Sequence, residues 1–108
     1  MLDGNLVLRY SVRVHVISKK VLRDFWLAHP DAQEPLLRWF RIVSRTDFDS
    51  FVHLRQTFPS ADLVGRHIVF NIAGNKYRLL ASIHFNRNKL YIRHVLTHPE
   101  YDQEAWKS

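Results

Sequence analysis

Four side chains in the C-terminal half of the chain have the chemistry that RNA cleavage without a metal ion requires. In that reaction a 2′-hydroxyl attacks the adjacent phosphorus, so the site needs a base, an acid for the leaving oxygen, and cations for the phosphoryl oxygens. Arginine binds two phosphate oxygens with its planar fork, and histidine transfers protons near neutral pH. If the C-terminal tail folds back over a sheet, these needs are met by Lys76, Arg78, His98 and Tyr101.

Three of these residues also have an ordinary structural interpretation. His98 is compatible with a turn residue in Thr-His-Pro-Glu, Tyr101 with an aromatic that covers the core, and Arg78 with a solvated strand arginine. On residue type alone, these interpretations remain open beside the catalytic one.

Neither a metal nor a cofactor is predicted. The chain has no cysteine, which excludes disulfides, thiolate zinc sites, iron–sulfur clusters and cysteine nucleophiles. No P-loop, dinucleotide-binding fingerprint, HExxH or Gly-x-Ser-x-Gly motif is present. The histidines are scattered, and most of them lie in a segment without carboxylates, so metal ligands are not expected to converge.

Positive charge is concentrated in one part of the chain. The net charge is +6, yet residues 63–99 contain no Asp or Glu. A solvated surface normally mixes both signs, so this segment predicts a surface that faces phosphates, with a plain basic surface as the alternative. Its basic residues are Arg66, Lys76, Arg78, Arg87, Lys89 and Arg93.

The first half of the chain predicts one strand and three helices. The β-branched, alternating residues 12–17 predict the strand, and Ser18 is expected to cap the first helix, which ends before Pro30. Asp31 and Glu34 have capping-box spacing for the second helix, whose buried stripe would be Leu36, Leu37, Trp39, Phe40 and Val43. Ser50 is expected to cap a third, short helix that stops before Pro59.

After Pro59 the spacing of the apolar residues changes from a helical period to a period of two. This alternation predicts a three-stranded meander over residues 66–72, 76–85 and 89–96. Strand alternation divides the middle strand into a helix-covered face, with Tyr77, Leu79, Ala81, Ile83 and Phe85, and an open face, with Lys76, Arg78, Leu80, Ser82 and His84. In the last strand it assigns Leu90, Ile92 and Leu96 to the core, and Lys89, Tyr91 and Arg93 to the open face. A one-residue bulge would invert part of this assignment.

These elements predict a single α+β domain over residues 1–108, with a small antiparallel sheet and the N-terminal helices packed on one face. No apolar run approaches the roughly 20 residues that span a bilayer. The first residues include an acid and lack the basic and apolar regions of a signal peptide. We therefore expect a cytoplasmic protein without a membrane partner.

Several motifs resemble one family. They are Val69-Phe-Asn-Ile-Ala-Gly-Asn-Lys-Tyr-Arg-Leu and Tyr91-Ile-Arg-His-Val-Leu-Thr-His-Pro-Glu-Tyr-Asp, supported by His29-Pro-Asp-Ala and Phe58-Pro-Ser-Ala-Asp. They resemble the HigB family of bacterial toxins, which belongs to the RelE-like superfamily. The resemblance runs from about Val14 to Asp102 and leaves residues 1–13 as a poorly matched N-terminal lead.

The resemblance implies a RelE-like fold and a toxin of a type II toxin–antitoxin system that cleaves ribosome-bound mRNA. Its implied partner is a helix-turn-helix antitoxin of the HigA type, and operator DNA would be bound only through that antitoxin. By motif, Arg78 would stabilise the scissile phosphate and His98 would transfer a proton. Tyr101 would orient or protonate the group at the cut, and Lys76 would contact phosphate.

Further RNA contacts are expected from two sets of residues. The helical set, for which ordinary helix solvation is the alternative, is Lys19, Lys20, Arg23, Arg38, Arg41 and Arg45. The set on the sheet is Arg66, His67, Asn71, Asn75, Tyr91 and Arg93.

Two other functions also fit the sequence. One is a non-catalytic RNA- or protein-binding module that would stack bases on Phe70, Tyr77 and Tyr91. The other is an inactive toxin homologue.

Overall fold

The structure is a computed structural model and describes residues 14–104 and 106. Its strands are β1 (His15–Ile17), β2 (Asp62–Val64), β3 (His67–Ile72), β4 (Tyr77–His84) and β5 (Lys89–Thr97). Its α-helices are α2 (Lys20–Ala28), α3 (Gln33–Arg45), α4 (Phe51–Thr57) and α5 (His98–Asp102), and its short 3-10 helices are η1 (Pro30–Ala32) and η2 (Phe85–Arg87). The first two residues of the predicted N-terminal strand lie outside the described residues.

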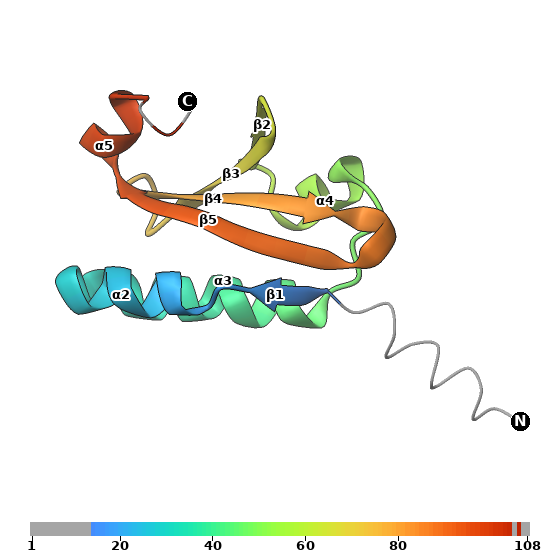
Figure 1. The fold of residues 1–108 in the computed structure, drawn as a ribbon, viewed down its shortest axis with the longest axis horizontal. Helices are drawn as coiled ribbons and strands as arrows, with labels where there is room; N and C mark the ends of the chain where they lie inside the picture. Colours follow the sequence, from blue (N-terminus) through green and yellow to red (C-terminus); the bar gives the residue numbers. More distant parts are fainter. Residues whose placement is uncertain (1–13, 105, 107–108) are drawn as a thin grey trace, which may run out of the picture.

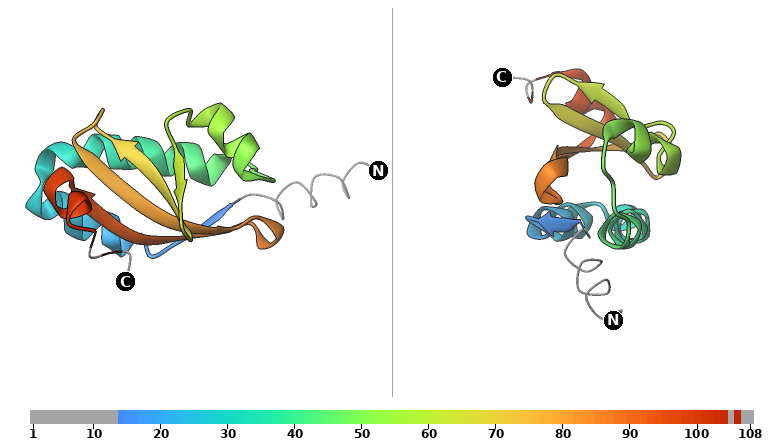
Figure 2. Two further views of the ribbon diagram at one scale, coloured as in Figure 1. Left: turned by 90° about the horizontal axis from the view of Figure 1, so that it is seen from above. Right: turned by 90° about the vertical axis from the view of Figure 1, so that its right-hand side faces the viewer.

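The strands form one five-stranded sheet in the order β1-β5-β4-β3-β2. β1 runs parallel to β5, and the other neighbouring strands are antiparallel. α2 and α3 lie side by side against one face of the sheet, whereas α5 lies on the opposite face (Figure 1, Figure 2). The predicted α+β fold is confirmed, and the parallel strand β1 makes the sheet mixed.

Two apolar clusters hold these layers together. The larger cluster fills the space between the sheet and the helices, where the ring of Phe70 contacts Trp39 at 5.3 Å and Phe58 at 5.1 Å between centroids. The smaller cluster lies on the other face and joins Val69, Leu80 and Trp106. The open face of the sheet is therefore partly covered by the C-terminal tail.

Of the two helix caps predicted from serines, one is correct. Ser50 caps α4, because its hydroxyl accepts a hydrogen bond from the His53 backbone N–H at 3.1 Å. Ser18 does not cap α2, whose N-cap is Lys19 and has no side-chain bond. Ser18 adopts a φ of 76° and offers its backbone carbonyl to Val21 at 3.0 Å, so it belongs to the turn before the helix.

The predicted meander is confirmed as β3, β4 and β5, and the unpredicted β2 extends it at the edge. The helix-covered face of β4 carries Tyr77, Leu79, Ala81 and Ile83 as predicted, and Phe85, which follows the strand in η2, packs against the same cluster. Between Leu80 and Ala81, however, the register with β5 shifts, and this irregularity reverses the alternation along β5. Val95 therefore joins the larger core cluster, and the prediction that Leu96 does so is wrong.

Helix α5 begins where β5 ends because the junction contains a capping box. The hydroxyl of Thr97 accepts from the Glu100 backbone N–H at 3.3 Å, and the Glu100 carboxylate accepts from the Thr97 backbone N–H at 2.8 Å. Pro99 lies in the first turn, where its missing N–H costs no helical bond. The sequence Thr-His-Pro-Glu thus fixes the direction in which the chain turns over the open face.

Replacing Thr97 with valine is expected to lower the free energy of unfolding by about 1 kcal/mol, since the capping bond is lost while the β-branched shape stays. Urea unfolding of both proteins measures this difference. Thr57→Val is a matched control, because Thr57 is exposed at the end of α4. Equal destabilisation by the two substitutions would contradict a capping role for Thr97.

Candidate active site

Arg78 of β4 is buried without an acidic partner among the described residues. It is 9% exposed. Its guanidinium donates to the Asn75 side-chain oxygen at 2.8 Å, the Asn75 carbonyl at 3.1 Å and the Tyr77 carbonyl at 3.2 Å. These neutral acceptors orient the group but leave its charge uncompensated, which is unfavourable in a buried position. Arg78 is therefore held ready to bind an anion such as phosphate.

Tyr101 and Trp106 form an aromatic stack beside Arg78. The Arg78 guanidinium carbon lies 5.6 Å from the centroid of the Tyr101 ring. Tyr101 stacks on Trp106 with a centroid separation of 5.0 Å and an interplanar angle of 11°, and the Trp106 Nε1–H donates to the Tyr101 carbonyl at 2.9 Å. Because Trp106 is anchored in the smaller core cluster, the stack fixes Tyr101 over the open face.

His98 is paired with Asp102 one helical turn later. Its Nδ1 lies 3.1 Å from the Asp102 Oδ2. An ionised carboxylate only accepts hydrogen bonds, so this contact places the imidazole proton on Nδ1 and leaves the lone pair of the neutral ring on Nε2. A histidine held by a carboxylate in this way is oriented as a proton acceptor.

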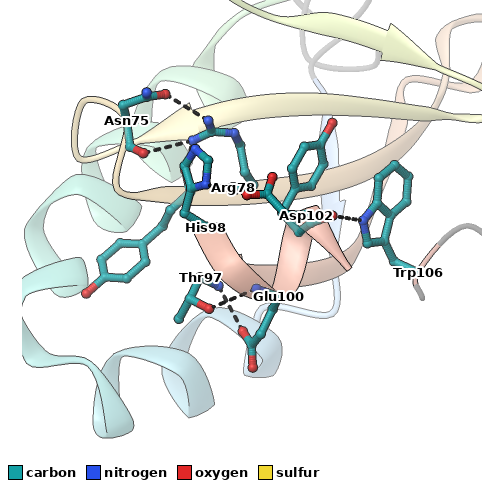
Figure 3. Close-up of polar contacts among 9 residues, drawn as sticks. Asn75, Arg78, Thr97, His98, Glu100, Asp102 and Trp106 are labelled. Carbon is teal, nitrogen blue, oxygen red and sulfur yellow. Dashed lines mark hydrogen bonds and ion pairs between the residues drawn. The ribbon is translucent and has the colours of Figure 1, made fainter. Parts of the chain in front are cut away.

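Arg78, His98 and Tyr101 converge because β5 turns into α5 next to the start of β4. Arg78 is paired with Leu96, directly before Thr97, where α5 begins, and its guanidinium lies 5.6 Å from the ring of Tyr101 in that helix. Figure 3 shows Arg78 and His98 in the region between β4 and α5. The arrangement combines a fixed cation, an oriented imidazole and a phenol, which are the groups that cleavage by a 2′-hydroxyl needs. The expected fold-back of the tail is confirmed.

Lys76 is not part of this group. Its ammonium pairs with Asp31, and the other oxygen of that carboxylate accepts from the Tyr77 hydroxyl at 2.6 Å. These contacts are on the helix-covered side, so the prediction that Lys76 shares a strand face with Arg78 is wrong. The predicted capping box of Asp31 and Glu34 is wrong for the same reason, because Asp31 lies in η1 and its carboxylate is used by the turn before β4.

The contacts of Asp31 shift three pKa values. The bonds from Lys76 and Tyr77 lower the pKa of Asp31, and the bond to Asp31 raises the pKa of Lys76 and of Tyr77. The lowered pKa of Asp31 stabilises the folded protein at pH values above the usual pKa of a carboxyl group. This stabilisation is lost as the pH falls through the lowered pKa. The raised pKa values of Lys76 and Tyr77 stabilise the folded protein at pH values below the usual pKa of each group. This stabilisation is lost as the pH rises through the raised pKa values.

Replacing Asp31 with asparagine is therefore expected to destabilise the protein at neutral pH. The difference in the free energy of unfolding between wild type and variant should become smaller toward both acid and alkaline pH. Urea unfolding at a series of pH values measures this dependence. Asp24→Asn is the matched control, because Asp24 forms an exposed pair with Lys20 within one helix. A destabilisation by Asp31→Asn that is the same at every pH would contradict the assignment to charge pairing.

The predicted RNA contacts fall into three places. Asn75 holds Arg78, and Asn71 is paired with Arg78 across the strands. A second group, toward the other end of the sheet, is Arg66, His67, Tyr91 and Arg93. The helical group is not brought near Arg78, because α2 and α3 cover the opposite face (Figure 1). It consists of Lys19, Lys20, Arg23, Arg38, Arg41 and Arg45.

The rings proposed for base stacking in the non-catalytic alternative are mostly inaccessible. Phe70 is 1% exposed and Tyr77 is 5% exposed, and both lie in the larger core cluster. Tyr91 is half-buried and lies against the ring of His84 at 5.4 Å. The prediction that these three rings form a surface for base stacking is therefore wrong.

Two residues of the site were not predicted. Asp102 could have been found from its i, i+4 spacing to His98, once Thr97 and Glu100 are recognised as a capping box that starts a helix. Trp106 follows the motif region and has no spacing signal that distinguishes it from an ordinary apolar residue.

Two general properties of the described residues complete the site. No three of their His, Asp or Glu side chains gather closely enough to hold a metal ion. In the same part of the chain, no helix is long and apolar enough to cross a membrane.

Comparison with known proteins places the chain in a family. Residues 32–104 match the HigB toxin family, described as the RelE-like toxic component of a toxin-antitoxin system. The chain belongs to this family. The mRNA interferase toxin HigB of Escherichia coli (strain K12) is 35% identical over 92 residues, which cover 82% of this chain and 88% of that protein. The mRNA interferase HigB of Escherichia coli O6:H1 is 28% identical over 93 residues, which cover 83% and 90%.

The expected membership in the HigB family is thus confirmed. As a HigB toxin, the protein is the toxic component of a pair, and an antitoxin is its partner. The matched segment includes Arg78, His98, Tyr101 and Asp102 of the candidate active site, whereas Trp106 lies just beyond it. The N-terminal lead, residues 1–13, lies outside both the match and the described residues.

Proposed function

We propose that this HigB toxin is an mRNA endoribonuclease that uses side chains, without a metal ion, to promote attack of a 2′-hydroxyl on the adjacent phosphorus. The observation that carries the proposal is the buried Arg78 without an acidic partner in residues 14–104 and 106, beside the His98–Asp102 pair. The names of the E. coli relatives, which are mRNA interferases, support the same activity.

In the proposed mechanism, Nε2 of His98 takes the proton from the 2′-hydroxyl, whose oxygen then bonds to phosphorus. Arg78 stabilises the charge that develops on the phosphoryl oxygens. The bond from phosphorus to the 5′-oxygen breaks, and the Tyr101 hydroxyl donates a proton to that oxygen. The products are a 2′,3′-cyclic phosphate and a 5′-hydroxyl. Lys76, which was expected to contact phosphate, is assigned instead to positioning the turn that carries Asn75.

The proposed setting is the cytoplasm, with ribosome-bound mRNA as the substrate. The proposed antitoxin is a helix-turn-helix protein of the HigA type, encoded beside the toxin, and operator DNA would be bound only through it. The helical cations Lys19, Lys20, Arg23, Arg38, Arg41 and Arg45 are proposed to contact ribosomal RNA, because their side chains are exposed and α2 and α3 lie on the face of the sheet opposite α5 (Figure 1).

The test is to induce the toxin in cells and to map RNA ends by primer extension. New 5′ ends within coding regions are expected, and the matching 3′ ends should carry 2′,3′-cyclic phosphate. Three-prime hydroxyl ends would contradict the proposed chemistry, and the absence of new ends would leave the protein as an inactive toxin homologue or a non-catalytic binding module.

A further inference from the structure

A wide hollow, here called the distal groove, lies on the open face away from Arg78. It has a volume of about 1060 Å³ and is formed by the turn between β2 and β3, the end of β4, and Trp106. Its polar lining residues are Arg66, His67, Ser82, His84 and Arg93, and none of the described residues that line it is acidic.

The charges of the distal groove favour an anion. Arg93 is held in place, because its Nε–H donates to the Ser82 hydroxyl at 3.3 Å and its guanidinium carbon lies 5.0 Å from the centroid of the Tyr91 ring. Partial burial lowers the pKa of His67, and the neighbouring His94, Arg93 and Arg66 lower it further. The groove is therefore a positive environment that disfavours the protonated form of His67.

The distal groove is connected to the candidate active site by aromatic contacts. Trp106 lines the groove and lies edge-on to His67 at 5.8 Å, while its face stacks on Tyr101 beside Arg78. Ser82 follows Arg78 by four residues in the same strand, a separation of about 13 Å. A single strand of nucleic acid spans that separation in a few nucleotides.

We propose that the distal groove is a second substrate subsite that binds single-stranded RNA a few nucleotides from the scissile phosphate. Arg66 and Arg93 bind backbone phosphates, and His67 and Trp106 form an aromatic wall beside a base. This inference rests on the proposed function, because the cut at Arg78 defines the path of the strand. The aromatic wall and the connection to the active site favour RNA over an acidic polypeptide, which needs neither.

The experiment uses a fluorescent RNA oligonucleotide in which every 2′-hydroxyl is replaced by a 2′-O-methyl group, so that it lacks the attacking hydroxyl and cannot be cut. Its affinity for the full chain is measured by anisotropy over a range of salt concentrations. Arg66→Gln and Arg93→Gln are each expected to weaken binding severalfold and to reduce the slope of log K against log salt by about 0.7. Arg55→Gln, on the exposed surface of α4, is the matched control and should leave the slope unchanged.

Binding is also expected to raise the pKa of His67, because a phosphate offsets the neighbouring positive charges. An NMR titration of His67 with and without the oligonucleotide measures this change. Equal losses in all three arginine variants, displacement by polyglutamate as effective as by the unlabelled oligonucleotide, or no binding by the wild type would each overturn the subsite. Because the oligonucleotide is never cleaved, this binding measurement is independent of the nuclease activity. A failure of the nuclease proposal would instead appear as a protein that binds the oligonucleotide normally but does not cleave ordinary RNA.

Discussion

Replacing Arg78 with glutamine is expected to reduce RNA cleavage by about 10³-fold or more, the range found when an arginine that stabilises phosphoryl transfer is removed. That loss corresponds to about 4 kcal/mol of transition-state stabilisation. The physical reason is that Arg78 is the buried cation of the site, and no acidic residue among those described compensates its charge. The measurement is kcat/KM for cleavage by the purified toxin, with circular dichroism to show that the fold is intact.

Two further variants decide whether charge alone explains the effect. Arg78→Lys keeps a positive charge but cannot reproduce the three contacts to Asn75 and Tyr77 or a two-point contact with phosphate, so its activity should lie between wild type and Arg78→Gln. Arg87→Gln removes an exposed arginine from η2 and serves as the matched control. Comparable cleavage by Arg78→Gln and Arg87→Gln would rule out the assigned role.

The parts of the fold that depend on local pattern were predictable. The apolar spacing of α3 and the alternation along β4 follow from residues near one another in the chain. The errors arise where a distant residue decides the outcome. Asp31 has the spacing of a capping residue, but its carboxylate is used by Lys76 and Tyr77, which lie more than 40 positions away. Likewise, the register shift beside Leu80 depends on how two strands pair.

The candidate site was predictable to a similar degree. The residue types and the acid-free segment indicated a phosphate site, and the family resemblance supplied the roles of Arg78, His98 and Tyr101. The removal of Lys76 from the site could not be predicted, because alternation places it on the open face, whereas the turn before β4 directs it to Asp31. Trp106 was missed because its importance comes from stacking on Tyr101, a contact that no local pattern indicates.

Replacing His98 with glutamine is expected to reduce cleavage by about 10² to 10⁴-fold, the usual contribution of a positioned general base. Glutamine has a similar length but cannot take a proton from the 2′-hydroxyl. The measurement is single-turnover cleavage with saturating toxin, which separates the chemical step from binding. His53→Gln is a close control, because His53 pairs with Asp49 at 3.2 Å with the same spacing but lies on α4. Near-normal cleavage by His98→Gln would exclude it as the base.

Asp102 tests whether the orientation of His98 matters. Asp102→Asn should lower cleavage by less than His98→Gln, because the histidine remains but its Nδ1–H loses the carboxylate 3.1 Å away. If Asp102 acts only through His98, the double variant should be no slower than His98→Gln alone, since residues that act as a unit are not additive. Independent, additive losses would instead mean that Asp102 contacts the substrate itself. The double variant therefore distinguishes a positioning residue from a second catalytic one.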